Sequence, residues 1–305
     1  MKRFPSLVLA AAVTLAATSL AGAQQPARPD SSGYVAANGV SYWFEIHGKG
    51  EPLLLLHGGL FSTGLWGPTL SKLAESRRVI GVDLHGHGRT ALGARSKISL
   101  EDIGRDLAVV VEKLGLRQVD VMGYSFGGGA AMQLAFQHPS LVRRLVVVSA
   151  PYAQNGFFAE MLPQQAAVSG KMAEGMKETP MYTSYAAIAP KPEDFPRLLD
   201  AMGEFMRQPY DWSAKVKQLS MPVMLVYGDA DMIRPEHIVS FYQLLGGGQR
   251  DAGWTREHMS KNRLAILPNV THYEMGVSPG LVSTVVPFLD GPAGTAAGGP
   301  VQPRR

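Results

Sequence analysis

The stretch VDVMGYSFGGGAAMQLAF, residues 119–136, decides how this chain folds. Val119 to Met122 form a short, mainly apolar run of the kind found in buried parallel strands. Gly123-Tyr124-Ser125-Phe126-Gly127 follows at once, and a helix is predicted from Phe126 to Gln137. A strand that turns directly into a helix leaves little space, so glycines on both sides of Ser125 are needed for a sharp, strained turn. Such a turn would present the Ser125 hydroxyl above the sheet, with the helix N-terminus behind it.

Short apolar runs alternate with amphipathic stretches on both sides of this turn. Buried parallel strands are predicted at residues 53–56, 79–82, 119–122, 145–148, 223–226 and 264–267, and helices at residues 71–77, 100–114, 126–137, 235–245 and 279–289. Asn38-Gly39, between extended runs at residues 34–36 and 40–44, is typical of a hairpin turn. The sequence therefore predicts an α/β fold with a mostly parallel, doubly wound sheet opened by an antiparallel hairpin.

Residues 149–220 break this alternation, because no buried-strand run occurs there. The segment is helical in propensity and rich in Met, Pro and aromatic residues. We expect an inserted helical cap at about residues 151–220, over the carboxyl edge of the sheet, where α/β folds bind their ligands. Its methionines suit ordinary core packing as well as an adaptable pocket. A second irregular stretch, residues 246–262, is a polar, Gly-rich loop without a predicted function.

The composition excludes several classes of protein. With 305 residues, 46% hydrophobic and 18% charged, the chain suits one large globular domain. It has no cysteine, which excludes disulfides, a thiolate nucleophile and sulfur-based zinc sites. Four basic residues near the termini, Lys2, Arg3, Arg304 and Arg305, account for the formal charge of +4. The remaining body is about neutral and has no basic patch with interleaved aromatics, so we expect no nucleic-acid partner.

The first 23 residues have the pattern of a secretory signal peptide. Lys2-Arg3 is followed by an apolar run from Leu7 to Leu20, and Ala21-Gly22-Ala23 supplies small residues for cleavage before Gln24. A membrane anchor fits less well, because the run is shorter than the roughly 20 residues that span a bilayer. We therefore expect an extracytoplasmic protein, periplasmic or secreted, with no stable membrane anchor after cleavage. Beyond the leader, residues 24–33 are expected to form a flexible lead-in, residues 34–290 the folded domain and residues 291–305 a disordered tail.

A serine hydroxyl is a weak nucleophile and needs a base within hydrogen-bonding distance. When Ser follows a strand in this way, the other two groups are expected in the order acid, then His. Asp229 and Asp231 both follow the predicted strand at residues 223–227, and His272 follows the last strand. We expect His272 to take the Ser125 proton and later protonate the leaving group. One of the two aspartates would hold the His272 tautomer and stabilise the imidazolium.

Acyl transfer also requires donors for the developing oxyanion. The backbone N–H of Phe126, directly after the nucleophile, is one candidate. The second is expected from the loop His57-Gly58-Gly59-Leu60, with Gly59 preferred and Leu60 as the alternative.

Metal and cofactor sites are not predicted. His85 and His87 could form a metal pair, but with no third ligand in view a role in a tight loop fits better. His47, His138, His237 and His258 follow no spacing pattern and are interpreted as surface or helix-end residues. Gly246-Gly247-Gly248 lacks the continuation of a phosphate-binding loop, so no nucleotide is expected.

Taken together, these residues resemble the α/β-hydrolase superfamily from about residue 34 to residue 289. The matching pieces are His57-Gly58, the segment Asp83 to Thr90, the Ser125 turn, Gly228 to Asp231 with Pro235, and His272. The resemblance implies that the acid is Asp231, in G-x-x-D-x-x-x-P, rather than Asp229. It also implies a structural role for His57 and a loop-shaping role for residues 83–90.

Departures within the resemblance narrow the expected chemistry. Ser125 argues against the epoxide hydrolases and haloalkane dehalogenases, which use an aspartate nucleophile, and the lack of cysteine argues against dienelactone hydrolase relatives. Leu60 interrupts the extended HGGG loop of lipases. The resemblance thus implies a serine hydrolase of small carboxylic esters, without a cofactor. The alternatives are carbon–carbon bond hydrolysis, perhydrolysis, acyl transfer, or a ligand-binding or sensing protein with little turnover.

Overall fold

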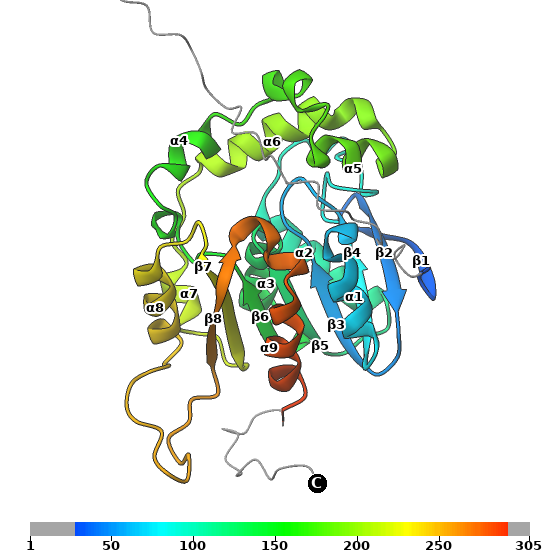
Figure 1. The fold of residues 1–305 in the computed structure, drawn as a ribbon. Coiled ribbons are helices and arrows are strands. Elements are labelled where there is room, and N and C mark those ends of the chain that lie inside the picture. The colour runs from blue at the N-terminus through cyan, green and yellow to red at the C-terminus, as the bar shows by residue number, and fades with distance from the viewer. Residues whose placement is uncertain (1–27, 292–305) are drawn as a thin grey trace, which may run out of the picture.

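The computed structural model describes residues 28–291 and contains one eight-stranded sheet with helices on both faces (Figure 1). The strands are β1 (Ser31–Ala37), β2 (Val40–His47), β3 (Glu51–Leu56), β4 (Arg77–Val82), β5 (Val119–Tyr124), β6 (Val142–Val148), β7 (Val223–Ala230) and β8 (Arg263–Thr271). Their spatial order is β1-β2-β4-β3-β5-β6-β7-β8. β2 is antiparallel to β1 and to β4, and every other pair is parallel. The predicted mostly parallel sheet with its antiparallel hairpin is confirmed.

The hairpin turns at Asn38 and Gly39, whose φ angles of 47° and 86° are both positive. Two left-handed residues are what a two-residue turn needs to match the twist of the flanking strands. β1 begins at Ser31, earlier than the expected start at residue 34, and pairs Ser31 with Ile46. Antiparallel pairing uses backbone groups, so the strand extends into residues that carry no apolar pattern.

The helices are α1 (Gly67–Ala74), α2 (Leu100–Lys113), α3 (Phe126–Gln137), α4 (Met161–Ala166), α5 (Pro180–Ile188), α6 (Phe195–Arg207), α7 (Ser213–Val216), α8 (Pro235–Leu244) and α9 (Pro279–Leu289). α2, α3 and α8 pack on one face of the sheet, and α1 and α9 on the other. Successive leucines of β3 serve the two faces in turn: Leu54 and Leu56 join the first core, and Leu53 and Leu55 the second. Alternation of this kind follows from the two-residue period of a strand.

The first helix differs from the prediction of residues 71–77. α1 ends at Ala74, and Arg77 already pairs with Glu51 as the first residue of β4. Arg77 is buried because it reaches Asp120 of β5, with Nη1 2.9 Å from Oδ2. Arg143 also binds Asp120, with Nη2 2.8 Å from the same oxygen. These cations explain how a carboxylate is tolerated inside a strand that is buried along its whole length.

The chain between β6 and β7 forms α4 to α7, and Figure 1 shows α4, α5 and α6 above the sheet, at the end opposite to the protruding loop at residues 246–262. The predicted helical insertion is thus confirmed, while its limits at residues 151–220 stay a prediction. Its two ends are joined by a bridge between Ala153 and Asp211, and a second bridge links Phe157 to Ile233 after β7. α6 forms a buried part of the cap, in which Phe195, Leu198 and Leu199 are fully or almost fully buried.

Parts of the domain prediction lie outside the described residues: the leader at residues 1–23, residues 24–27 of the lead-in, and residues 292–305 of the tail. Between residues 28 and 291, no helix is long and apolar enough to cross a membrane.

Candidate active site

Ser125 occupies the turn between β5 and α3, with φ 53° and ψ −117°. A Cβ on Gly123 would lie 2.1 Å from the carbonyl oxygen of Gly127, and a Cβ on Gly127 would lie 2.4 Å from that of His57. Neither position can hold a larger residue without displacing backbone, which explains why glycines flank this serine. The Ser125 N–H donates to the carbonyl of Val148 (2.9 Å), which anchors the strained turn to β6.

The structure brings three of the predicted residues into one hydrogen-bonded chain. His272 Nε2 lies 3.1 Å from Ser125 Oγ, and His272 Nδ1 lies 2.9 Å from Asp231 Oδ1. Asp229 is exposed and instead accepts a bond from the Val270 N–H (3.2 Å). The geometry therefore favours Asp231 over Asp229 as the partner of His272, and the catalytic roles of all three residues stay predictions.

The His272 loop is held from two directions. His272 begins a 3-10 helix, His272–Val277, whose N-terminus is closed by a capping box between Thr271 and Glu274. From the sheet, the hydroxyl of Tyr124 donates to the His272 carbonyl (2.6 Å). These contacts hold the backbone of His272 in place beside Ser125.

Asp231 has a further partner that the sequence did not reveal. Ser149, directly after β6, is fully buried with φ 49°, and its hydroxyl donates to Asp231 Oδ2 (2.5 Å). Burial by itself would raise the pKa of Asp231, but the hydrogen bond and charge of His272, then the Ser149 hydroxyl and the Gly228 N–H, lower it below its ordinary value. The carboxylate is thus held ionised where it can support an imidazolium.

The predicted oxyanion donors lie next to Ser125. The N–H groups of Gly59, Leu60 and Phe126 form no hydrogen bond with any residue from 28 to 291, and all three residues line the pocket above Ser125. Leu60 adopts φ 62°, a left-handed conformation unusual for leucine. Both Gly59 and Leu60 therefore stay candidates for the second donor, beside Phe126.

His57 supports this loop from below. The Leu84 N–H donates to His57 Nε2 (2.9 Å), which leaves Nδ1 to donate to the Gly58 carbonyl (2.7 Å). Burial lowers the pKa of His57, so the ring is neutral, as this pair of bonds requires. The arrangement agrees with the structural role that the family resemblance implies.

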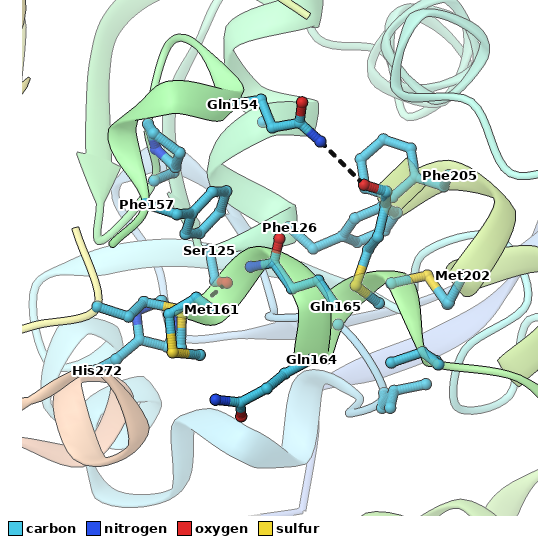
Figure 2. A pocket seen from close by; sticks show the side chains of 18 of the residues that line it. Ser125, Phe126, Gln154, Phe157, Met161, Gln164, Gln165, Met202, Phe205 and His272 are labelled. Carbon is cyan, nitrogen blue, oxygen red and sulfur yellow. Dashed lines mark hydrogen bonds between the residues drawn. The ribbon is translucent and has the colours of Figure 1, made fainter. Parts of the chain in front are cut away.

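A pocket of about 400 Å³ opens above Ser125 and His272, between the sheet and the cap. Figure 2 shows Met161, Gln164 and Gln165 of α4 on the cap side of Ser125. Six methionines line this space: Met161, Met172, Met181, Met202, Met206 and Met232. Of the 24 described residues that form its walls, none is Asp, Glu, Lys or Arg.

Two histidines that are not part of the hydrogen-bonded chain from Ser125 to Asp231 form hydrogen bonds within a loop. His85 bonds the Leu92 carbonyl and His87 the His85 carbonyl, and burial lowers the pKa of His87 to about 3. Residues 28–291 contain no group of three His, Cys, Asp or Glu side chains that could hold a metal ion.

The interpretation as a surface or helix-end residue is wrong for His47, which is buried in β2, whereas His237 lies in the first turn of α8 but is buried there too. His237 stacks on Tyr152 with ring centroids 4.0 Å apart and accepts a bond from its N–H (3.2 Å). It thereby joins the start of the cap to α8. Only the packing of helices and strands determines which side of an element faces inward, and a lone histidine gives no signal of this.

A second cavity, of about 530 Å³, lies between β2, residues 61–65 and α5. Its walls include Glu45, His47 and Arg89, with the His47 Nε2 3.2 Å from the Glu45 carboxylate. None of the predicted catalytic residues lines it, and its charged walls differ from those of the pocket above Ser125.

Comparisons with known proteins agree with this fold. The profile of the alpha/beta hydrolase fold family matches residues 51–180. The chain is 29% identical to 2-hydroxymuconate semialdehyde hydrolase of Pseudomonas sp. (strain CF600) over 235 residues, 68% of this chain and 80% of that protein. It is 27% identical to the pimeloyl-[acyl-carrier protein] methyl ester esterase of Nitrosomonas europaea over 257 residues, 76% of this chain and 93% of that protein.

Among solved structures, carboxylesterase CesB from Bacillus subtilis superimposes with a TM-score of 0.64 at 19% identity, over 85% of this chain and 91% of that one. An esterase from Thermogutta terrifontis gives a TM-score of 0.65 at 19% identity, over 85% and 97% of the two chains. At such low identity these two likenesses speak for the fold alone. Together with the match of residues 51–180 to the family profile, the strained serine turn and the order of the sheet, they show that the chain has the α/β-hydrolase fold.

Proposed function

We propose that the protein is a serine carboxylic-ester hydrolase that works through an acyl-enzyme. The observation that carries the proposal is the chain of hydrogen bonds from Ser125 through His272 to Asp231 at the base of the pocket. Nucleophile, base and orienting acid are the groups that acyl transfer from a serine requires.

In the first half of the proposed reaction, Ser125 Oγ attacks the ester carbonyl while His272 Nε2 accepts its proton. Asp231 stabilises the imidazolium through Nδ1. The oxyanion is bound by the N–H of Phe126 and by that of Gly59, with Leu60 as the alternative donor. Removing one such donor typically costs about 100- to 1,000-fold in rate.

In the second half, the tetrahedral intermediate collapses, and His272 gives its proton to the departing alcohol. A water molecule then attacks the acyl-enzyme while His272 acts as the base. The carboxylic acid leaves, and Ser125 regains its proton from His272. The proton taken from Ser125 thus leaves with the alcohol, the proton taken from water restores the Ser125 hydroxyl, and no cofactor takes part in the proposed cycle.

The proposal is tested with p-nitrophenyl esters from acetate to palmitate, using protein that starts at Gln24 and its Ser125→Ala variant. We expect turnover of at least one ester by the unchanged protein and a loss of about 10⁵-fold or more in the variant. The best chain length would measure how much acyl chain the pocket accepts. Equal rates in the two proteins on every ester would refute the proposal.

Carbon–carbon bond hydrolysis is the second candidate, because the likeness to 2-hydroxymuconate semialdehyde hydrolase covers most of that protein. Relatives of this type carry the same three groups, so the triad alone does not separate the two reactions. A rate comparison does: if kcat/KM for 2-hydroxymuconate semialdehyde exceeds that for the best ester, the second candidate replaces the first.

A further inference from the structure

The walls of the main pocket carry no countercharge for an ionised ligand. Besides Ser125 and His272, its polar side chains come from Gln, Tyr and Trp residues, all neutral groups. The second cavity, on the other side of residues 59–61, has Glu45 and Arg89 in its walls. Charged side chains therefore lie nearby but are kept out of the space above Ser125.

This separation has an energetic consequence for the substrate. A carboxylate or ammonium group that enters an apolar pocket loses its interactions with water. Only an opposite charge or several hydrogen bonds from the protein can replace the free energy lost in this way. Thioether and aromatic walls supply neither. A neutral acyl chain loses no hydration of this kind and gains from leaving water.

Of the three amide side chains in the pocket walls, one is free to meet a polar group of the substrate. Gln165, on α4, points its carboxamide into the pocket on the Ser125 side in Figure 2, and this amide has no hydrogen-bond partner among residues 28–291. The neighbouring amides are engaged: Gln154 donates to the Met206 carbonyl (3.2 Å) and Gln164 to the Glu160 carbonyl (3.1 Å). A free amide both donates and accepts, so it suits a neutral oxygen such as an ester, ether or hydroxyl oxygen.

We propose that the pocket selects esters whose acyl and alcohol parts are both uncharged, and that Gln165 is the position that determines this selectivity. The inference rests on the proposed ester hydrolysis and names its substrate class. It separates the chain from its relative that acts on 2-hydroxymuconate semialdehyde, since that compound is a carboxylate. Medium-length acyl groups with a neutral oxygen toward the cap are the preferred substrates.

Three p-nitrophenyl esters of equal acyl length test the selectivity. One ends in a methyl ester (methyl adipate), one in a carboxylate (adipate) and one in a quaternary ammonium (6-trimethylammoniohexanoate). We expect kcat/KM for the neutral ester to exceed both charged ones by about 100-fold or more, since a buried unpaired charge is strongly disfavoured. Equal values for the neutral and anionic esters would overturn the selectivity.

A charge placed at residue 165 tests the position. Gln165→Lys is expected to raise the ratio of anionic to neutral kcat/KM by about 30-fold, because it supplies the missing countercharge. Ala167→Lys is the matched control, since it adds the same charge at an exposed site that does not line the pocket. If both variants change the ratio equally, a general effect of net charge explains it and Gln165 does not determine selectivity.

Binding to the Ser125→Ala variant keeps this inference separate from the proposed function. Calorimetry with heptan-2-one and 6-oxoheptanoate compares a neutral ligand with an anionic one of similar shape, and needs no turnover. Tighter binding of the neutral ketone by about tenfold or more supports the neutral pocket even if no ester is hydrolysed. Equal binding overturns it even if esters are hydrolysed.

Discussion

The sheet and the cap hold their residues by different means. Ser125, Asp231 and His272 each follow a strand of one parallel ladder, so their spacing is determined by backbone hydrogen bonds. The cap includes two very short helices, α4 of six residues and α7 of four, and three separate 3-10 turns lie between α4 and α6. Its pocket residues are mostly half-buried methionines and aromatics whose positions depend on side-chain packing. We therefore expect substitutions in the cap to alter substrate selectivity and to leave the catalytic chemistry largely unchanged.

The largest loss of activity is expected when the acid Asp231, which directly follows β7, is changed. Asp231→Asn should lower kcat by about 10⁴-fold, because an amide would favour the wrong His272 tautomer. Asp229→Asn is the matched control: the same change two residues away, at an exposed carboxylate bonded to the Val270 N–H. Steady-state kinetics on the best ester measure both variants. A larger loss in Asp229→Asn would show that the acid had been assigned to the wrong aspartate.

A smaller effect is expected for Ser149, which supports Asp231 without touching substrate. Ser149→Ala should lower kcat by about tenfold and leave KM nearly unchanged, because one hydrogen bond to a buried carboxylate is lost. Ser149→Gly, which removes the same hydroxyl and suits the positive φ of 49°, should show a similar loss of activity. A large change in KM, or unchanged activity in the Gly variant, would indicate a packing role only.

The Ser149 variant also has a defined pH dependence. The pKa of Asp231 is lowered in the fold, so its ionisation contributes stability above the unfolded pKa of about 3.9, and this contribution disappears as the pH falls through the folded pKa. Removing the Ser149 hydroxyl raises the folded pKa and reduces that contribution. Urea unfolding should therefore separate Ser149→Ala from the unchanged protein more at pH 7 than at pH 3. An equal difference at both pH values would contradict the assignment.

A substitution in the cap is expected to have the smallest effect on kcat and the clearest effect on the selectivity between substrates. Met161→Ala should raise the ratio of decanoate to acetate kcat/KM by about fivefold, since it removes a side chain that lines the pocket beside Ser125 and His272 (Figure 2). Leu162→Ala is the control on the same helix, because Leu162 does not line the pocket. If acetate turnover fell by as much as the selectivity changed, the cap would contribute to the chemistry as well as to substrate selectivity, contrary to this prediction.

Much of the fold could be predicted because its signals are local. The apolar runs, the Asn38-Gly39 turn and the glycines around Ser125 each depend on a few adjacent residues, and the structure shows the predicted sheet and serine turn. The errors in the predicted elements lie at their ends. The sequence pattern predicts Arg77 as the end of a helix, but Arg77 begins β4, where it forms an ion pair with Asp120, 43 residues away. No local pattern reports such a partner.

The sequence by itself determined the α/β class, the strained serine and the order of serine, acid and histidine, because each follows from short-range sterics or from residue spacing along the chain. Tertiary structure decided that Asp231 rather than Asp229 faces His272, that Ser149 holds Asp231, and that the charged side chains stay out of the main pocket. The physical reason is that these contacts join the ends of different strands, or the cap to the sheet. Ser149 and Asp231 are 82 residues apart, and only the packed ladder brings them together.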